Sequence, residues 1–382
     1  MDYFEYLIFQ KRIKNMNQEL LYKIAITQIP GVGDVLIKNL VSHCGSPYAV
    51  FQEKKSLLLK IPGIGPLTSN AIKSSVELKR AELEIKFIEN NKIKPFFFTD
   101  VDYPHKLKLC PDSPAMLYYK GNSKLESNKV VGIVGCRKPT EYGNTITKNL
   151  VHSLKDKGVM VVSGLAYGID VTSHLSCIEN NIQNIGVLAH GLDRIYPGEH
   201  YPIAKKMETC GGVLSEFISG TNPDKENFPR RNRIVAGLCD ALVVVESKID
   251  GGSMITADIA HSYNRDVLAF PGKNTDENSK GCNYLIKRNK AAMIESAEDL
   301  FYHMNWEPEN KTINKKVQTS LPIDLNENES KVYEVLKEKT KVHIDEICQF
   351  LSMPMSKISG LLLNLEVQAF IISLPGKFYS IS

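Results

Sequence analysis

Three arginines are crowded into the segment FPRRNRIVAGL, which spans residues 228–238. Pro229 favours the first turn of a helix, and the apolar residues that follow continue a helical stripe. Arg230, Arg231 and Arg233 would then lie near the amino end of that helix, where cations are unfavourable by about 0.3–1 kcal/mol each. Guanidinium groups and a helix amino end together form a strong anion site. The segment therefore predicts phosphate binding, in which the bound anion relieves the repulsion.

Phe228 and Lys225 lie just before these arginines. An aromatic ring beside basic residues can stack on a nucleobase while the cations hold the backbone. The same ring can instead pack beneath the helix as a hydrophobic staple. Likewise, any one of the arginines can form an internal ion pair, with Glu216 or Glu246 as its partner. Both alternatives stay open at the level of the sequence.

Glycine, serine, threonine and basic residues recur in other short segments, and an apolar run that predicts a strand leads into each of them. These segments are GIVGCR at 132–137, SGLAYGID at 163–170, HGLDRIYP at 190–197, GGSMIT at 251–256 and PGK at 271–273. Small residues allow backbone amides to approach an anion closely, and arginine or lysine supplies charge. If these segments meet at one edge of a sheet, they form a phosphate-binding crevice.

The elements that must position these segments are short strands alternating with helices. Apolar runs predict strands at 130–134, 159–162, 185–188, 212–214, 241–245 and 267–269, with 292–294 as a further candidate. Such alternation is typical of an α/β fold with a mostly parallel sheet and helices on both faces, whose crevice lies at the carboxyl ends of the strands. Residues 81–304 are predicted as this domain. Its leading extension, 81–128, contains strands at 93–98 and 115–121.

An internal repeat precedes this domain. The pentapeptide IPGVG at 29–33 recurs as IPGIG at 61–65, and each copy lies between two apolar helical segments. Glycine permits a tight turn between helices, and the turn amides can face a phosphate. Residues 1–80 are therefore predicted as a helix-hairpin-helix (SAM-like) domain. Such pairs serve as DNA contacts or as packing modules, and the sequence leaves both open.

The end of the chain has a different pattern. Residues 305–323 are polar and aperiodic, which predicts a linker. Helices are then predicted at 327–339, 343–351 and 355–367, followed by two short strands around a Pro-Gly turn within 370–381. Three small helices and a hairpin are typical of a winged-helix domain, here at 324–382.

Composition limits the classes of protein that fit. Of the 382 residues, 43% are hydrophobic and 24% are charged, and the net charge is +4, as in a globular protein with a mildly basic surface. The eight cysteines form no CxxC pair and the nine histidines no HExxH spacing, so we expect reduced thiols and no metal site. GxGxxG and GxSxG are absent, and no apolar run reaches the roughly 18–20 residues of a membrane span. Residues 1–15 are predicted as a helix or an ordered tail.

In their order and spacing, these segments resemble the DNA-processing protein A (DprA) family over most of the chain. The resemblance is carried by GCR at 135–137, SGLAYGID at 163–170, GLDRIYP at 191–197, FPRRNRIVAG at 228–237, GGSMITA at 251–257, FPG at 270–272 and S-x-G-x-N at 279–283. It implies a Rossmann-like core that forms a homodimer and binds single-stranded DNA without strong sequence preference. It further implies a cytoplasmic, non-enzymatic protein without a cofactor, which protects incoming strands in natural transformation and helps to load RecA recombinase. Contact with duplex DNA through the terminal domains is an additional expectation.

The motif match also carries over a set of DNA-contact residues, none of them catalytic or metal-binding. They are Arg137, Ser163, Gly164, Lys225, Phe228, Arg230, Arg231, Asn232 and Arg233, followed by Gly252, Ser253 and Lys273. Two features depart from the family pattern. Cys136 replaces a usual serine, which removes a hydroxyl contact, and Ala189 and His190 stand where a glycine-rich turn is more usual.

An enzyme is the main alternative. The crevice also resembles that of the lysine-decarboxylase-like nucleotide hydrolases, which cleave the N-glycosidic bond of nucleoside monophosphates with the glutamate of a P-G-G-x-G-T-x-x-E loop. The corresponding loop here, 248–258, lacks the G-T-x-x-E pattern, and Asp258 is its candidate acid. A nucleotide-sensing module without catalysis is the third hypothesis.

Helical geometry predicts how the arginines are arranged. At about 100° per residue, Arg230 and Arg233 lie on one face of the helix, and Arg231 lies on the side of the apolar stripe. Together with Arg137, we expect the three to form an unneutralised cluster in the crevice, which is costly when no anion is bound.

Overall fold

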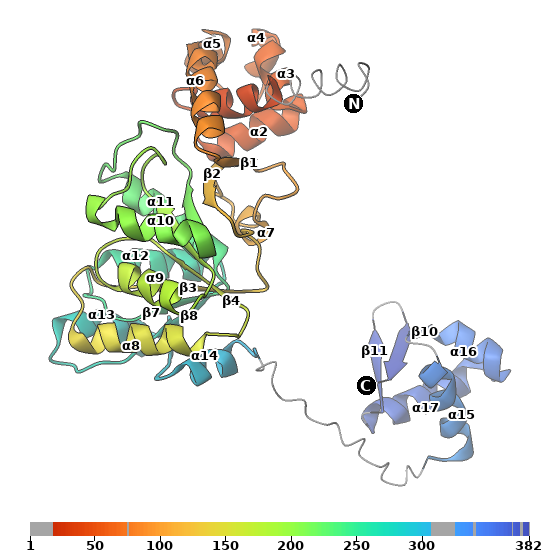
Figure 1. Cartoon of the computed structure of the whole chain (residues 1–382). Coiled ribbons are helices and arrows are strands. Elements are labelled where there is room, and N and C mark those ends of the chain that lie inside the picture. The colour runs from red at the N-terminus through yellow and green to blue at the C-terminus, as the bar shows by residue number, and fades with distance from the viewer. Residues whose placement is uncertain are drawn as a thin grey trace, which may run out of the picture. The chain divides into compact units, whose positions relative to one another are not determined.

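The computed structural model describes residues 18–74, 76–306, 325–338, 341–368, 370–374 and 377–381. The chain divides into two units, residues 1–308 and 309–382, and each is described by itself (Figure 1). The predicted helix or tail at residues 1–15 and most of the predicted linker at 305–323 lie outside the described residues. Among the described residues, every helix is too short or too polar to span a bilayer.

Within the described residues, a nine-stranded sheet forms the centre of the first unit (Figure 1). From one edge to the other, its strands are β1 (Lys94–Phe97), β2 (Met116–Gly121), β6 (Gly211–Ser215), β5 (Asn184–Leu188), β4 (Val159–Ser163), β3 (Lys129–Val134), β7 (Ala241–Val244), β8 (Asp266–Ala269) and β9 (Ala292–Met293). The β1–β2 and β2–β6 pairs are antiparallel and the other pairs are parallel. The predicted α/β class with a mostly parallel sheet is confirmed, and each predicted strand is present to within a residue at either end.

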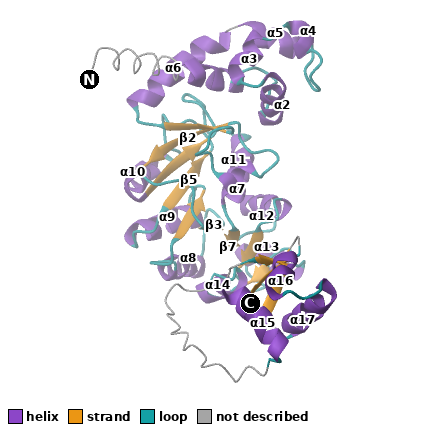
Figure 2. Cartoon of the chain, turned by 90° about the vertical axis from the view of Figure 1, so that its right-hand side faces the viewer, coloured by secondary structure: helices purple, strands orange, loops and turns teal. Residues whose placement is uncertain are grey.

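Helices cover both faces of this sheet. They are α8 (Glu141–Ser153), α9 (Ile169–Glu179), α10 (Tyr201–Cys210), α11 (Asn227–Leu238), α12 (Gly252–Ser262), α13 (Lys280–Lys287) and α14 (Ala297–His303). Successive side chains of a strand point to opposite faces. Val130 and Val134 of β3 therefore share a core with α11, α12 and α13, whereas Val131 and Ile133 share another with α8, α9 and α14. In Figure 2, α8, α9 and α10 lie on one side of the strands and α11, α12 and α13 on the other.

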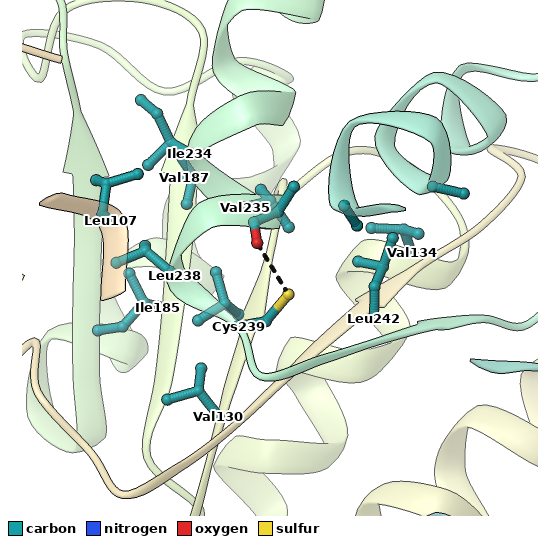
Figure 3. Packing of buried hydrophobic residues seen from close by; sticks show 14 of the residues in the cluster. Leu107, Val130, Val134, Ile185, Val187, Ile234, Val235, Leu238, Cys239 and Leu242 are labelled. Carbon is teal, nitrogen blue, oxygen red and sulfur yellow. Dashed lines mark hydrogen bonds between the residues drawn. The ribbon is translucent and has the colours of Figure 1, made fainter. Parts of the chain in front are cut away.

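The core beneath α11 fixes the position of this helix. Ile234 and Leu238, one turn apart, are buried in the same cluster as Ile185 of β5 and Leu107 (Figure 3). Burying each such side chain contributes about 1.5–3 kcal/mol. The Cys239 thiol, which follows the helix, donates a hydrogen bond back to the last turn at 3.3 Å. α11 is thus anchored along its length, and its amino end has a defined place at the edge of the sheet.

The eight cysteines are free thiols in the structure, and Cys110, Cys177, Cys239 and Cys282 are buried. Burial raises the pKa of the Cys239 and Cys282 thiols to about 12, which keeps both protonated at neutral pH. In the part of the chain that the structure describes, no group of His, Cys, Asp or Glu side chains is arranged to hold a metal ion.

A helical region precedes the sheet. Its helices are residues 18–27, α2 (Asp34–Cys44), α3 (Pro47–Gln52), α4 (Lys55–Leu58), α5 (Pro66–Ser74) and α6 (Val76–Asn90). In each copy of the repeated pentapeptide, the fourth residue donates its N–H to the carbonyl of the first at 3.1 Å. Gly31 and Gly63 have φ values of 77° and 86°, which other residues rarely adopt. A helix–turn–helix arrangement is therefore present at each copy, whereas the assignment as a DNA-contacting helix-hairpin-helix stays a prediction.

Side chains of this region attach it to the sheet. α6 runs to Asn90, past the predicted domain boundary at residue 80. Within it, Glu84 pairs with Arg80 at 3.0 Å and accepts hydrogen bonds from the amide and hydroxyl of Ser219, in the segment that follows β6. At the start of α2, Asp34 accepts the N–H of Ala115 at 2.7 Å. Polar contacts at the two ends of the helical region therefore join it to the part of the chain that carries the sheet.

The second unit combines three helices with a small antiparallel sheet. Its elements are α15 (Glu327–Glu338), β10 (Val342–His343), α16 (Ile344–Leu351), α17 (Met355–Val367), β11 (Ile371–Leu374) and β12 (Phe378–Ile381). The strands pair in the order β10-β12-β11. Val332, Ile347 and Leu362, one from each helix, are buried in a common core. The predicted winged-helix pattern of helices and hairpin is present.

Candidate nucleic-acid interface

A cavity of about 460 Å³ lies at the carboxyl ends of β3, β4 and β7. Its walls come mainly from the loops that follow these strands, from residues 228–235 of α11 and from the amino end of α12. β3 lies between β4 and β7, so the order of strands along the chain reverses here. Ligands of open α/β sheets bind at such switch points. Four of the segments predicted to form a crevice, at 132–137, 163–170, 228–238 and 251–256, therefore converge at the place where this fold offers one, whereas 190–197 and 271–273 lie outside the described walls of this cavity.

The cavity is lined by an excess of positive charge. Among the described residues, its ionisable walls are Arg137, Lys138, Arg231 and Lys248 against Asp170, a balance of 4 − 1 = 3 positive charges. Arg137, Lys138 and Lys248 are exposed, whereas Arg231 is only 5% exposed. In the described chain, no carboxylate lies within the 4.0 Å of an ion pair to Arg137 or Arg231. An anion entering this cavity thus meets cations that are not already neutralised.

Arg231 is the buried member of this group. Its Nη1 donates a hydrogen bond to the carbonyl of Val187 at 2.6 Å, and its Nε has no partner among the described residues. Burial lowers the pKa of Arg231 below its ordinary value, while Asp170 acts to raise it and Arg137 to lower it. A buried cation is costly when its nearest opposite charge, here Asp170, lies beyond ion-pair distance. An anion in the cavity would remove that cost.

The segment SGLAYGID forms the wall beside Arg231. A Cβ at Gly164 would collide with the Arg231 guanidinium, so a side chain there would displace the guanidinium from this position. Asp170 closes the loop, because its Oδ2 accepts the N–H groups of Gly164 at 3.2 Å and of Ala166 at 3.4 Å. Burial raises the pKa of the Asp170 carboxyl, whereas Arg231 and the amides act in the opposite direction. The motif therefore serves to seat a guanidinium against the backbone.

α12 begins at the cavity. Gly251 is its N-cap, and Gly252 and Ser253 form its first turn and line the wall. The first amides of a helix lack intrahelical acceptors and carry partial positive charge. The Ser253 hydroxyl is engaged elsewhere, because it donates to the hydroxyl of Ser247 at 2.7 Å. α12 therefore offers backbone amides, rather than a hydroxyl, to an anion.

A buried carboxylate holds the loop that carries Arg137. Glu246, 2% exposed, accepts hydrogen bonds from the Thr140 amide at 2.9 Å, from the Thr140 hydroxyl and from the Cys136 thiol at 3.6 Å. Burial and the nearby Glu246 raise the pKa of Cys136 to about 12, so the thiol stays protonated and can donate. At the position where the family usually has serine, a thiol contact therefore takes the place of the lost hydroxyl.

Phe228 provides an aromatic wall. The carbon of the Arg137 guanidinium lies 5.5 Å from its ring centroid, and the Tyr196 ring meets it edge-on at 6.2 Å. The ring is partly exposed and lines the cavity. This position favours the base-stacking interpretation over a staple buried beneath the helix.

The arginines of α11 lie further from the amino end of the helix than the sequence predicted. α11 begins at Asn227, so Phe228 lies inside its first turn and Arg231 and Arg233 lie in the second. The penalty for cations in a first turn therefore does not apply to these two. Arg231 does reach the cavity beside Arg137, as the helical geometry predicted.

The predicted unneutralised cluster of four arginines is wrong. Arg233 pairs with Glu216 at 2.5 Å and with Asp34 at 3.1 Å, and Arg230 pairs with Glu216 at 3.3 Å. Because Arg230 and Arg233 lie on one face of the helix, a single carboxylate reaches both. The alternative of an internal ion pair, with Glu216 as the partner, is confirmed for these two residues.

Of the predicted contact residues, seven line the cavity: Arg137, Gly164, Phe228, Arg231, Asn232, Gly252 and Ser253. The remaining five, which are Ser163, Lys225, Arg230, Arg233 and Lys273, lie outside its described walls. Ser163 is fully buried, and its hydroxyl donates to the carbonyl of Ile133 at 2.6 Å, which braces β4 against β3. Lys225 and Lys273 are exposed in loops.

Sequence reasoning missed several residues of the wall. They include Lys138, Lys248 and Asn278, whereas Asp170, Ile255 and Thr256 belong to predicted crevice segments but were not among the predicted contact residues. Lys138 directly follows the segment 132–137, and Lys248 lies shortly before the segment 251–256. A basic residue beside a recognised segment could therefore have indicated both. Asn278 comes from the loop after β8, and its Nδ2 donates to the carbonyl of Lys138 at 3.0 Å. Nothing in its sequence context indicates that contact.

Two family models match the chain, DNA recombination-mediator protein A over residues 94–305 and the DprA winged helix domain over residues 317–377. Protein Smf of Synechocystis sp. is 31% identical over 95% of this chain and 99% of its own length. DNA processing protein DprA of Bacillus subtilis is 42% identical over 52% of this chain and 67% of its own length. Both the cavity and α11 lie inside the first matched range.

Solved structures give the same result. The X-ray structure of DprA from Streptococcus pneumoniae superposes with a TM-score of 0.65 and 30% identity, over 74% of this chain and 97% of that one. A structure of DprA from Helicobacter pylori, determined to show its single-stranded DNA binding mode, superposes with a TM-score of 0.51 and 26% identity, over 56% of this chain and 96% of that one. The sheet, the cavity at its switch point, the winged helix and these matches together place the chain in the DprA family of DNA recombination-mediator proteins.

Proposed function

We propose that this chain binds single-stranded DNA by its phosphates, in the cavity between β3, β4, α11 and α12. The observation that carries the proposal is Arg231, a buried guanidinium without a carboxylate partner in the described chain, beside Arg137 and the amino end of α12. Phosphates are common to every nucleotide, so guanidinium and amide contacts to them carry no sequence information. Binding is therefore independent of sequence.

The aromatic wall supports a single strand over a duplex. Phe228 can stack on a base only where that base is unpaired, and such stacking is tolerant of sequence because every base has a π-face. The Helicobacter pylori relative is described as binding single-stranded DNA. Membership in a family described as recombination mediators supports the wider role. We propose that the chain acts as a homodimer in the cytoplasm, protects incoming strands in natural transformation and helps to load RecA recombinase onto them.

We propose no catalytic activity for this cavity. Asp258, the candidate acid of the alternative hydrolase hypothesis, is exposed on α12 and pairs with Lys290 at 2.8 Å. Asp170 and Glu246 accept hydrogen bonds that hold the loops around them. These engagements favour a binding role over N-glycosidic cleavage. An assay for release of free base from nucleoside monophosphates tests this directly, and turnover that Asp170→Asn abolishes would establish the hydrolase instead.

The binding proposal is tested by the salt dependence of affinity for oligo-dT. A single strand releases counterions with a slope of about −0.7 per phosphate neutralised, so three to five contacts give a log–log slope of roughly −2 to −4. Fluorescence anisotropy at several salt concentrations measures it, with a duplex of equal length as the control. A slope near zero, or tighter binding to the duplex, would contradict the proposal. Loading of RecA is tested separately, by its assembly on strands coated with single-strand-binding protein.

A further inference from the structure

Three aromatic rings border a shallow hollow beside the cavity. Tyr167, Tyr196 and Phe228 line it together with Arg137 and Arg231, and these two arginines and Phe228 also line the main cavity. The hollow has a volume of about 20 Å³, little more than one water molecule needs. A base cannot be enclosed there, but it can lie across the rim against a ring.

Both tyrosine rings are partly exposed to solvent, so an unpaired base can reach them. Tyr196 is 47% exposed and Tyr167 is 42% exposed. Exposed aromatic rings next to basic side chains are the usual platform for unpaired bases. The planes of Tyr196 and Phe228 are inclined by 61°, so one flat base cannot stack on both. Two successive bases would therefore have to unstack from each other for each to lie on its own ring.

Hydrogen bonds hold the backbone of Tyr196 and the ring of Tyr167 before any ligand arrives. The Tyr196 amide donates to Nε2 of His190 at 3.2 Å, and the other ring nitrogen of His190 contacts the carbonyl of Gly191 at 2.9 Å. His190 is buried, and burial lowers its pKa, which keeps it neutral so that Nε2 can accept. The Tyr167 hydroxyl donates to Glu199, on the far side of the ring from the backbone. The Tyr196 ring itself packs edge-on against Phe228. Rings that are already packed or hydrogen-bonded lose less freedom when a base binds.

We infer that this hollow is a second base-stacking position for single-stranded DNA, with Tyr196 and Tyr167 as its platform. The inference rests on the proposed function, because it needs a strand in the cavity. A phosphate held between Arg137 and Arg231 lies at the boundary that the cavity and the hollow share. One base then stacks on Phe228 and the neighbouring base on the tyrosine side.

Affinity measurements on matched variants form the first test. Tyr196→Ala weakens oligo-dT binding by at least about fivefold, the lower end of what one stacked base contributes. Tyr196→Phe keeps the ring and binds like the wild type. Tyr302→Ala is the control, because Tyr302 is 90% exposed on α14 and lines neither the cavity nor the hollow. If Tyr196→Ala binds like the wild type, the inference is overturned.

Photocrosslinking separates a direct contact from indirect support of Phe228. An oligo-dT in which single thymines are replaced by 5-iodouracil is irradiated with the full-length protein, and the adducts are located by peptide mass spectrometry. Adducts on Tyr196 or Tyr167, at a nucleotide adjacent to the one that reaches Phe228, support the inference. Adducts on Phe228 alone, together with weak binding by Tyr196→Ala, would mean that Tyr196 only buttresses Phe228 and would overturn it. Failure of the proposed function has a different signature, because the wild type itself would then show no salt-dependent binding.

Discussion

Neighbouring arginines on one helix have opposite energetic roles in this protein. Arg231 is buried beside the cavity with no carboxylate in ion-pairing range within the described chain, whereas Arg233 is buried between Glu216 and Asp34. Removing a charge that lacks a partner relieves desolvation, but removing one that has partners leaves their charges uncompensated. The first arginine is therefore suited to a ligand and the second to the fold.

Substituting each by methionine, which has similar length and no charge, should separate binding from stability. We expect Arg231→Met to lose oligo-dT affinity while its Tm stays near that of the wild type. Removal of a buried charge offsets the lost hydrogen bond to Val187 and the lost attraction to Asp170, whose carboxyl has a pKa already raised by burial. We expect Arg233→Met to lose about 3–5 kcal/mol of unfolding free energy. Urea denaturation without ligand and DNA titration at fixed salt measure both. A clearly destabilised Arg231→Met that binds DNA normally would show that this arginine is structural.

At the scale of residues, the sequence predicted which face of α11 each arginine occupies, but it did not predict all of the carboxylates that pair with them. The spacing of Arg230 and Arg233 correctly placed both on one side, and Glu216 was among the partners considered. Asp34 was not, because it lies 199 residues from Arg233 in the chain and comes from the helical region. Contacts of that separation depend on how domains pack, and no local pattern of residues encodes them.

At the scale of elements, α9 and β5 meet through a buried histidine. His174 of α9 is fully buried, its Nδ1 contacts Asn184 Oδ1 of β5 at 3.0 Å, and its Nε2 has no partner among the described residues. Burial lowers its pKa from 6.5 to about 4. The unfolded chain therefore takes up a proton below pH 6.5, whereas the folded chain resists it until about pH 4.

Stability should consequently fall with acid over this interval. The depressed pKa means that the unfolded state binds more protons between pH 6.5 and 4, so the unfolding free energy decreases as pH falls, by roughly 2 kcal/mol at pH 5 from this residue. Urea denaturation at pH 7.5 and pH 5 measures the difference. His174→Gln keeps a hydrogen-bonding group for Asn184 and removes the titration, so its loss between the two pH values should be smaller. If His174→Gln loses as much unfolding free energy between the two pH values as the wild type does, another group is responsible for the acid sensitivity.

Elements were the most predictable level of this structure. β3, β4 and β5 are buried on both faces, so their apolar runs are continuous and hard to mistake. The antiparallel edge formed by β1 and β2 was predicted as two strands but not as part of the same sheet, because pairing is a tertiary choice. α11 begins slightly earlier than its sequence indicated. Pro229 favours the first turn of a helix, but Asn227 and Phe228 before it are also helical.

The winged helix illustrates what a fold match leaves open. α17, its third helix, carries one basic residue, Lys357, and one acidic residue, Glu366. Leu363 and Val367 are exposed on it. Phosphate contacts require clustered positive charge, and this helix has little. Duplex binding by the terminal domains therefore stays a prediction, and α17 offers it little support.

At the scale of the whole molecule, the proposed homodimer would place two cavities on one particle. A strand long enough to reach both would then bind with an avidity gain of about 10²–10⁴ over one that fills a single site. Light scattering should give about twice the 42.8 kDa mass of the chain. Affinity should rise steeply once oligo-dT exceeds the length that spans the two sites. A monomer whose affinity levels off at the length of one site would contradict this arrangement.

The adjacency of β3 and β7 also sets when the cavity comes into being during synthesis. The Cys136 loop is completed by Glu246, 110 residues later in the chain. At about 5–20 residues per second, a ribosome needs roughly 5–20 s to make that stretch. For most of that interval the emerging polypeptide already has Arg137 and Gly164, but it lacks β7, which closes the switch point, and α12. The proposed phosphate site of the nascent chain therefore cannot assemble before α12 and the residues up to Asn278 have been made, when the central domain is nearly finished.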